Sequence, residues 1–319
     1  MPAARLLVLS SRAGGLNAET EAHLRQELSD HTVVRFGAVK RIRSLVTPNA
    51  KVVVAGGDGT VGAVVRQLAD TRCRIGVIPL GTFNNFATSL RVPADLDKAI
   101  DVAQRGRARS ITLGHVNGVV FLEACAVGLF GETIRLGEYA KDGRLQGITA
   151  KIRRVLTARP FRYELSKDLV RSGTAMSLVF SNTYSTGFQL PVGNSTPADR
   201  YLDFSAQAGS THLDIAGRAL ASALLAKHRE KGAGQVFRFR KLRVVTKPRV
   251  RAYADHVPAG YTPLTVSAEL SRQARAGPPG GEPTRCPCRC RHRPSRLQRR
   301  RLGSDAPGTP ATCRPRQRG

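Results

Sequence analysis

The sequence predicts a doubly wound α/β domain over residues 1–112, followed by a β-rich, sandwich-like second domain. Two observations lead to this fold class. Up to about residue 112, short apolar runs that suit buried strands alternate with helical periodicity, as is typical of a parallel sheet with helices on both faces. From about Ile111 onward, turns rich in Gly, Asn, Asp and Pro separate strand-like runs, which indicates a mostly β domain.

In the first domain, strands and helices are predicted from different periodicities. A strand covered on both faces shows a continuous apolar run, and such runs are Leu6–Leu9, Thr32–Val34, Lys51–Ala55 and Ile75–Ile78. Apolar residues three and four apart predict helices around Leu24 and Leu28, over Val61–Leu68 and over Leu96–Ala103. Asn17 and Asp95 precede the first and last of these helices as candidate N-caps.

The second domain is assigned to residues 113–255, and residues 256–270 are expected to return to the cleft between the domains. The predicted strands are Ile111–Leu113, Val119–Ala126, Ala175–Phe180, Tyr201–Ala206, Gln235–Phe239, Leu242–Thr246 and Thr262–Val266. Helices are expected only at Leu145–Leu156 and Leu213–Lys227. Residues 271–319, rich in Arg, Pro, Gly and Cys, predict a disordered basic tail or an end read in a shifted frame.

The positive net charge of the chain favours an anionic partner but does not identify which one. The formal net charge is +28, and the body stays basic without the 13 arginines of residues 271–319. Such a balance suits a nucleotide, an anionic membrane surface or nucleic acid. Because the tail has no aromatic residue to stack on bases, nucleic acid is not expected as a partner. The basic residues 151–154, with Arg159 and Arg162, are the candidate contact with anionic lipid headgroups.

Two further observations predict a cytoplasmic protein. No apolar run approaches the roughly 20 residues of a membrane-spanning helix, and Leu6–Leu9 is interpreted as a buried strand rather than part of a signal sequence. Of the six cysteines, only Cys73 and Cys125 lie in the body, and isolated cysteines are typical of reduced core positions.

The strongest functional signal is the segment Gly56-Gly57-Asp58-Gly59-Thr60. It follows a buried strand and opens a helix, so its glycines allow close backbone approach and the helix N-terminus attracts anions. This arrangement suits a polyphosphate, with Thr60 as a hydroxyl donor and Asp58 orienting Mg²⁺ or its water shell. The alternative is a tight turn that uses glycine only for packing.

The second signal follows the next predicted strand and contains Gly81, Thr82 and Asn84. Ligands of open α/β sheets gather outside the carboxyl ends of the strands, so the two loops are expected to face one crevice. Asn84 could hydrogen-bond a phosphate, a ribose or its own loop. The alternative is an ordinary helix start with Thr82 or Asn84 as its cap.

The pair of motifs resembles the diacylglycerol kinase catalytic family, which includes bacterial lipid kinases and sphingosine kinases, over about residues 5–266. The resemblance implies an NAD-kinase-like nucleotide domain, ATP and Mg²⁺ as cofactors, and phosphoryl transfer to a lipid hydroxyl such as that of diacylglycerol. It also implies a peripheral protein at the inner face of the membrane, and a homodimer is compatible with it. The residues implied to bind the nucleotide are Gly56, Gly57, Asp58, Gly59, Thr60, Gly81, Thr82 and Asn84.

Three further positions have roles only through this resemblance. The loop that begins at Ser10 matches one near the nucleotide, but it lacks the usual Asn-Pro pair. Gly128 matches the residue that opens the lipid-side cleft. Asp199 matches an aspartate that helps hold a structural Mg²⁺ with main-chain carbonyls, although Arg200 stands where the family has glycine.

The largest departure from the family pattern lies at Asp255-His256-Val257. The family has Asp-Gly-Glu here, and its glutamate is the proposed base that deprotonates the lipid hydroxyl, whereas valine cannot accept a proton. Asp58 and Asp255 are therefore the candidate catalytic residues, with Asp255 or His256 as the base. The alternatives are transfer with little help from a base, a catalytically impaired nucleotide-binding homologue, an NAD kinase-like enzyme and a nucleic-acid-binding protein.

Overall fold

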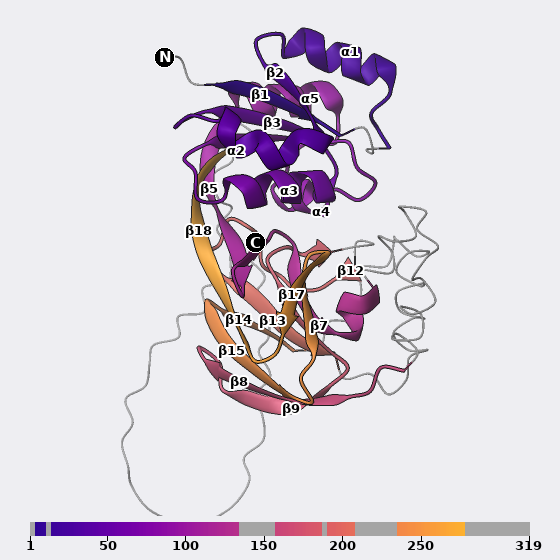
Figure 1. Ribbon diagram of the computed structural model, residues 1–319, viewed down its shortest axis with the longest axis vertical. Coiled ribbons are helices and arrows are strands. Elements are labelled where there is room, and N and C mark those ends of the chain that lie inside the picture. Colours follow the sequence, from indigo (N-terminus) through magenta and orange to yellow (C-terminus); the bar gives the residue numbers. More distant parts are fainter. Residues whose placement is uncertain (1–3, 11–13, 134–156, 187–189, 208–234, 278–319) are drawn as a thin grey trace, which may run out of the picture. The chain divides into compact units, whose positions relative to one another are not determined.

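The computed structural model describes residues 4–10, 14–133, 157–186, 190–207 and 235–277 (Figure 1). These residues form two large β-sheets and a two-stranded ribbon, with helices on both faces of the first part of one sheet. The predicted fold class, an α/β first part followed by a β-rich, sandwich-like second part, is confirmed. No helix among the described residues has the length and apolar character needed to span a membrane.

Parallel strands form the start of the larger sheet. Their order is β2 (Thr32–Arg35), β1 (Arg5–Leu9), β3 (Lys51–Gly56) and β4 (Arg74–Pro79). Successive residues of β1 and β3 are buried, because helices cover both faces of the sheet. Each predicted strand of this part is confirmed and is one residue longer at one or both ends.

Figure 1 shows helices on both sides of these strands. The core on one face joins Leu7 and Val53 of the sheet to α1 (Ala18–Glu27) and α5 (Leu96–Arg105). The core on the other face joins Val8 and Val52 to η1 (Phe36–Arg41), α2 (Ile42–Leu45), α3 (Asp58–Leu68) and α4 (Asn85–Ser89). Because adjacent strand residues point to opposite faces, consecutive apolar residues supply both cores.

Local signals set where two helices begin. Asn17 accepts a hydrogen bond from the backbone N–H of Thr20 at 2.7 Å, and Asp95 accepts one from that of Lys98 at 3.0 Å. Each side chain satisfies a donor that has no partner within the first helical turn. Both predicted N-caps are confirmed, and α1 and α5 begin at the next residue.

The larger sheet continues into the β-rich part through β18 (Leu264–Gly277). This strand runs parallel to β4 at Ala274 and Arg275, and its first residues pair with β15 (Lys241–Lys247). The sheet then adds β8 (Phe161–Lys167) and β9 (Arg171–Ala175), while β5 (Arg107–Val116) and β6 (Val119–Phe121) branch from β18. One sheet therefore serves both parts of the described chain.

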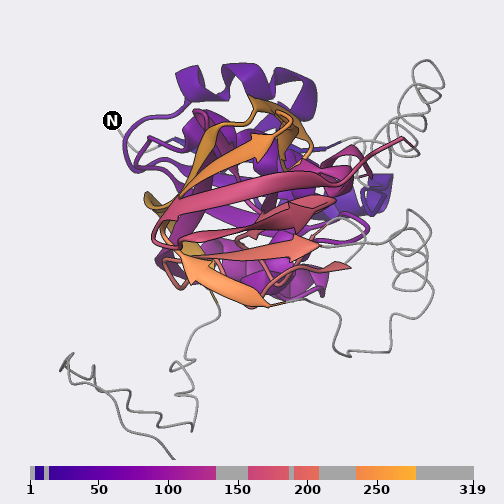
Figure 2. The same cartoon turned by 90° about the horizontal axis from the view of Figure 1, so that it is seen from below.

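The second large sheet is antiparallel and packs on the first. Its order is β14 (Val236–Phe239), β13 (Leu202–Gln207), β10 (Ser177–Ser181), β7 (Ala124–Gly128), β16 (Arg251–Ala254) and β17 (Val257–Tyr261). Phe180, Phe204 and Phe239 of this sheet share a core with Tyr163 and Leu242 of the other. Figure 2 shows the strands that follow residue 157 in pink to orange. The ribbon consists of β11 (Ser185–Thr186) and β12 (Leu190–Pro191).

The structure differs from the sequence prediction at several points in this part. The predicted strand Val119–Ala126 is divided into β6 and β7, and Glu123 lies at the break. Residues 256–270 form β17 and the first half of β18, and their return to the cleft between the domains stays a prediction. β18 runs to Gly277 and so includes residues 271–277, the first residues assigned to the basic tail.

Other expectations concern specific segments and thiols. The predicted helices at 145–156 and 213–227 and the basic residues 151–154 lie outside the described residues. Arg159 and Arg162 are exposed. Cys73 and Cys125 are buried free thiols, as expected for core positions.

His31, between α1 and β2, is a buried imidazole that the fold keeps neutral. Its side chain is 1% exposed, and its Nδ1 lies 2.5 Å from the carboxylate of Asp30. Nε2 is buried and has no hydrogen-bond partner among the described residues. Burial, together with the nearby charges of Lys51 and Arg5, lowers the pKa of His31 from 6.5 to about 4.

This environment predicts a pH-dependent stability. The pKa of His31 in the folded protein lies below its ordinary value of 6.5. The contribution of the neutral His31 imidazole to the free energy of unfolding is therefore complete above pH 6.5 and is lost as the pH falls toward 4. Lowering the pH from neutral to about 5 is expected to reduce the free energy of unfolding by 1–2 kcal/mol more, as an order of magnitude, in wild type than in His31→Gln. Urea unfolding at both pH values measures this difference, and parallel pH profiles would contradict it.

Candidate functional site

Three loops meet at the carboxyl ends of β1, β3 and β4. The backbone N–H of Ser10 donates to Ala55 at 3.2 Å, that of Leu80 to Gly56 at 3.2 Å, and that of Gly15 to Leu80 at 3.1 Å. These bonds continue the parallel sheet for one residue beyond the strands. The structure thus places both motif loops, and part of the loop that begins at Ser10, next to one another.

The two motif loops touch through their backbones. A Cβ added at Gly81 would lie 2.4 Å from the Cα of Gly57, and one added at Gly57 would lie 3.0 Å from the Cα of Gly81. Neither position can hold a side chain unless the loops separate. A Cβ at Gly59, in contrast, would meet nothing within 4 Å. The sequence therefore needs glycine at 57 and 81 for contact between loops, and position 59 has open space.

Asp58 bridges the same two loops. Its carboxylate accepts hydrogen bonds from the backbone N–H groups of Asn85 at 3.0 Å and Phe86 at 3.1 Å, in the first turn of α4. The sequence prediction placed Asp58 at Mg²⁺ or its water shell. In the structure it stabilises the start of α4 as an acceptor for amides that have no partner within the helix.

The second loop is closed by its own asparagine. Asn84 has a left-handed backbone with a φ of 50°, and its side-chain amide accepts from Gly81 N at 2.9 Å and donates to Gly81 O at 2.6 Å. Of the uses foreseen for Asn84, the structure shows the bond to its own loop. Thr82, between Gly81 and Asn84, is exposed at the tip of this loop.

The first turn of α3 is the part of this arrangement suited to an anion. The helix begins at Asp58, with Gly57 as its N-cap, and includes exposed Gly59 and buried Thr60. The first amides of a helix lack partners within it and point outward along its axis. Their partial positive charge favours phosphate oxygens, and the absence of a side chain at Gly59 leaves space beside them.

A buried polar cluster that the sequence prediction missed joins α4 to the β-rich part. Glu123, 8% exposed, accepts hydrogen bonds from Asn85 Nδ2 at 3.1 Å and Thr186 Oγ1 at 2.8 Å. Ser185 Oγ donates to Asn85 Oδ1 at 2.9 Å. The sequence signal that could have revealed this cluster is Glu123, a charged residue inside the otherwise apolar predicted strand Val119–Ala126. Asn85 is thus held on its side chain by β11 and on its backbone by Asp58.

Asp255 makes a second connection between the parts. It has a left-handed backbone, with a φ of 52°, at the turn between β16 and β17. One carboxylate oxygen accepts from Arg66 at 3.1 Å and from Leu122 N at 3.1 Å. The other accepts from Glu123 N at 2.9 Å and Ala124 N at 3.2 Å. Both oxygens of this candidate base are therefore engaged, and Arg66 carries the connection to α3.

A histidine and two buried cysteines are further side chains with reactive groups in this part of the chain. His256 and Val257, which follow it, are half-buried at the start of β17. Burial, and then the negative charge of Asp255, raise the pKa of the Cys125 thiol. Burial also raises the pKa of the Cys73 thiol. Both thiols are therefore protonated near neutral pH, which excludes them as nucleophiles.

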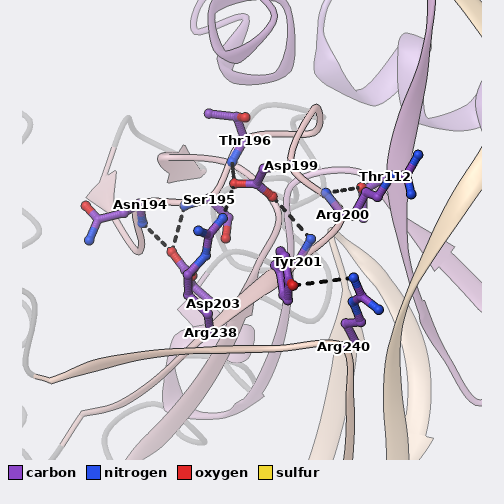
Figure 3. A network of polar contacts seen from close by, with 10 residues as sticks. All are labelled: Thr112, Asn194, Ser195, Thr196, Asp199, Arg200, Tyr201, Asp203, Arg238 and Arg240. Atoms are coloured by element: carbon purple, nitrogen blue, oxygen red, sulfur yellow. Dashed lines mark hydrogen bonds and ion pairs between the residues drawn. The ribbon is translucent and has the colours of Figure 1, made fainter. Parts of the chain in front are cut away.

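Asp199, the predicted metal ligand, forms its hydrogen bonds with residues outside the two motif loops. Its carboxylate accepts from Thr196 N at 3.1 Å, Tyr201 N at 3.2 Å and Arg238 Nη2 at 2.5 Å (Figure 3). These donors occupy the positions from which a cation would approach, so this arrangement does not fit a structural Mg²⁺. The described residues also contain no group of three or more His, Cys, Asp or Glu side chains that could hold a metal ion.

Comparison with known protein families and curated proteins bears on the first part of the chain. Residues 7–116 match the family model of the diacylglycerol kinase catalytic domain. The chain is 36% identical over 129 residues to a diacylglycerol kinase from Staphylococcus carnosus (strain TM300), covering 40% of this chain and 39% of that protein. It is 36% identical over 140 residues to the "Probable lipid kinase YegS-like" protein of Yersinia pestis (strain Pestoides F), covering 40% and 47%. The matched region thus spans less than half of either relative.

Solved structures extend the likeness of fold beyond this region. A diacylglycerol kinase from Bacillus anthracis str. Sterne superposes with a TM-score of 0.65 at 18% identity, covering 88% of this chain and 98% of that one. Yeast NADH kinase complexed with NADH superposes with a TM-score of 0.50 at 13% identity, covering 87% and 84%. At these identities, the comparison shows a shared fold.

The family resemblance predicted from the two motifs is confirmed by these findings. The matched residues include both motif loops, the bridge at Asp58 and the parallel strands that carry them. Residues 7–116 are thus similar to the diacylglycerol kinase catalytic domain, and the relatives that share this region are named as a diacylglycerol kinase and a probable lipid kinase.

Proposed function

We propose that this protein is an ATP-dependent lipid kinase, which transfers the γ-phosphoryl group of MgATP to the hydroxyl group of a lipid such as diacylglycerol. The observation that carries the proposal is the pair of loops at the starts of α3 and α4, joined by the Gly57–Gly81 contact and by Asp58. The family match over residues 7–116 supports kinase chemistry, and the names of the relatives support a lipid acceptor.

In this proposal the joined loops bind the nucleotide. Backbone amides of Gly56–Thr60 hold the phosphates at the start of α3, and the loop from Gly81 to Asn84 forms the adjoining wall with Thr82 at its tip. Phosphoryl transfer depends mainly on positioning and on stabilising charge that spreads over the phosphate oxygens. Fixed amides at a helix N-terminus supply both, and Mg²⁺ enters as part of the MgATP donor.

The two candidate catalytic aspartates act by positioning in this proposal. Asp58 fixes the relation of the two loops, because its carboxylate binds the backbone of α4. Asp255 fixes β16 and β17 against the segment 122–124 and, through Arg66, against α3. With both carboxylates engaged, transfer proceeds with little base assistance or with His256 as the proton acceptor.

The setting of the reaction follows from the donor and the acceptor. ATP is supplied on the cytoplasmic side, and a lipid acceptor lies in the adjoining membrane face. Exposed Arg159 and Arg162 carry the charge expected of a peripheral contact with anionic headgroups.

A phosphorylation assay tests the proposed function directly. Purified full-length chain is incubated with γ-labelled MgATP and mixed micelles that contain diacylglycerol, a sphingoid base or no lipid alcohol, with NAD as a soluble rival acceptor. Label is expected in a lipid product. Asp58→Ala is expected to reduce the rate about 100-fold or more, because small displacements of a phosphate-binding loop have effects of this size.

Asp168→Ala is the matched control for this assay. The Asp168 carboxylate also accepts two backbone N–H groups, those of Arg240 at 2.8 Å and Lys241 at 2.9 Å, but in an exposed turn of the β-rich part. It should leave the rate near that of wild type. Label in NAD would replace the proposal by an NAD kinase-like activity, and binding of ATP without labelled product would indicate an impaired homologue.

The contact between the loops predicts a difference between two glycine substitutions. Gly81→Ala places a methyl group 2.4 Å from the Cα of Gly57 and should separate the loops, whereas Gly59→Ala meets nothing within 4 Å in the same site. Calorimetric titration with MgATP is expected to show affinity reduced at least about tenfold for Gly81→Ala, or about 1.4 kcal/mol. Equal losses for both variants, or none for Gly81→Ala, would contradict the assigned roles.

Substitutions at Asp255 and Arg66 separate positioning from proton transfer. Asp255→Asn is expected to lower the free energy of unfolding by about 3 kcal/mol, because it leaves Arg66 and backbone amides poorly paired in a mostly buried place. Arg66→Gln removes no candidate base. If Asp255 acts by positioning, this variant should nevertheless reduce both the free energy of unfolding and the turnover. Wild-type stability with abolished turnover in Asp255→Asn, and full turnover in Arg66→Gln, would instead identify Asp255 as the base.

A further inference from the structure

The turn around Asp199 departs from the family pattern at the residue that follows the aspartate. Arg200 stands in place of glycine and adopts a φ of 63°. Its backbone N–H donates to Thr112 Oγ1 at 3.0 Å, and Asp199 accepts from the amides on either side of the turn. The turn is thus built without glycine, and Figure 3 shows the carboxylate of Asp199 hydrogen-bonded to Thr196 and Tyr201.

A second carboxylate lies close to this turn. Asp203 on β13 is fully buried, and its Oδ2 accepts hydrogen bonds from the backbone N–H groups of Asn194 and of Ser195, the latter at 2.6 Å. Its Oδ1 is buried and has no hydrogen-bond partner among the described residues. Burial of an ionised carboxylate is costly unless a positive charge compensates it.

Arg238 supplies that positive charge to both carboxylates. It lies opposite Asp203 in the β13–β14 register, with its Nε 3.9 Å from Asp203 Oδ1. Its Nη2 is 2.5 Å from Asp199 Oδ2. The planar guanidinium thus faces two carboxylates at once, a task that a bound metal ion commonly performs in proteins.

An aromatic ring holds Arg238 in this position. Its guanidinium carbon lies 4.9 Å from the centre of the Tyr201 ring, and that of Arg240 lies 4.8 Å from the same ring. Arg240 also donates to the Tyr201 hydroxyl at 3.3 Å. Burial raises the pKa of Asp199, and the amides of Thr196 and Tyr201, followed by the charge of Arg238, oppose this rise. Arg238 is thus one of three groups that favour the ionised form of Asp199.

We propose that the Arg238 guanidinium is the built-in cation of the Asp199 turn, so that the β-rich part is stabilised there without a divalent metal ion. This inference is independent of the proposed kinase activity. A metal ion at Asp199 would lie beside the Arg238 guanidinium, and the repulsion between the two positive charges disfavours binding of the metal.

Thermal unfolding of the full chain without nucleotide tests the exclusion of metal. The melting temperature of wild type is expected to agree to about 1 °C between millimolar MgCl₂, millimolar CaCl₂ and EDTA at equal ionic strength, because a ligand that does not bind the native state cannot stabilise it. A metal-dependent rise in wild type that disappears in Asp199→Asn would overturn the proposal.

Variants test the role of the guanidinium itself. Arg238→Gln is expected to lower the melting temperature by about 3–5 °C, since it removes the positive charge from two carboxylates while solvent screens the half-exposed guanidinium. Arg240→Gln loses contact with the same ring, but among the described residues Arg240 forms no ion pair within 4 Å and acts only at longer range on the exposed Asp168, so this variant should lower the melting temperature much less. Equal melting temperatures for the two variants would contradict the proposal.

Two further variants keep the test decisive if Arg238→Gln does not fold. Arg238→Lys retains the charge without the planar fork and should melt between wild type and Arg238→Gln. Arg238→Gln combined with Asp199→Asn should recover stability relative to Arg238→Gln, because the coupling between the two charges is then removed. A double variant no more stable than Arg238→Gln, or no more soluble where that variant does not fold, would count against Arg238 as the cation.

Discussion

The contact between the backbones of Gly57 and Gly81 is the constraint on which the candidate site depends. Two loops can approach this closely only where neither carries a Cβ, and the approach brings Asp58 within reach of the amides that begin α4. A single carboxylate then holds both loops. The starts of α3 and α4 are thus fixed relative to each other before any ligand binds, which lowers the cost of ordering a phosphate site.

The same loops are connected to the β-rich part by buried polar side chains. Glu123 binds Asn85 of α4, and Asp255 binds Arg66 of α3 while it accepts the amides around Glu123. Both connections meet at the break between β6 and β7, where Glu123 lies and where Asp255 accepts the amides of residues 122–124. A displacement of the β-rich part would therefore be felt at both helices, which suits a reaction whose donor and acceptor must be brought together.

The sequence predicted features that depend on neighbouring residues. Buried strands such as β3 and the caps Asn17 and Asp95 follow from short patterns, and the motif loops follow from glycines at strand ends. It could not predict pairs that only strand register brings together, such as Arg238 with Asp203. The metal role of Asp199 and the base role of Asp255 came from the family resemblance and stay predictions, and the sequence could not show that Arg238 and Arg66 contact these carboxylates. The break at Glu123 was missed because its partners come from distant segments.

Amide hydrogen exchange with and without MgATP tests the central claim most directly, because it reports on the backbone of each loop separately. The account predicts slower exchange on adding MgATP for peptides that cover residues 56–60 and 81–86. It predicts unchanged exchange for the β8–β9 hairpin, which β18 and β15 separate from β4 in the larger sheet. Unchanged exchange in both loops, or protection confined to the β-rich part, would show that the joined loops are not the phosphate site.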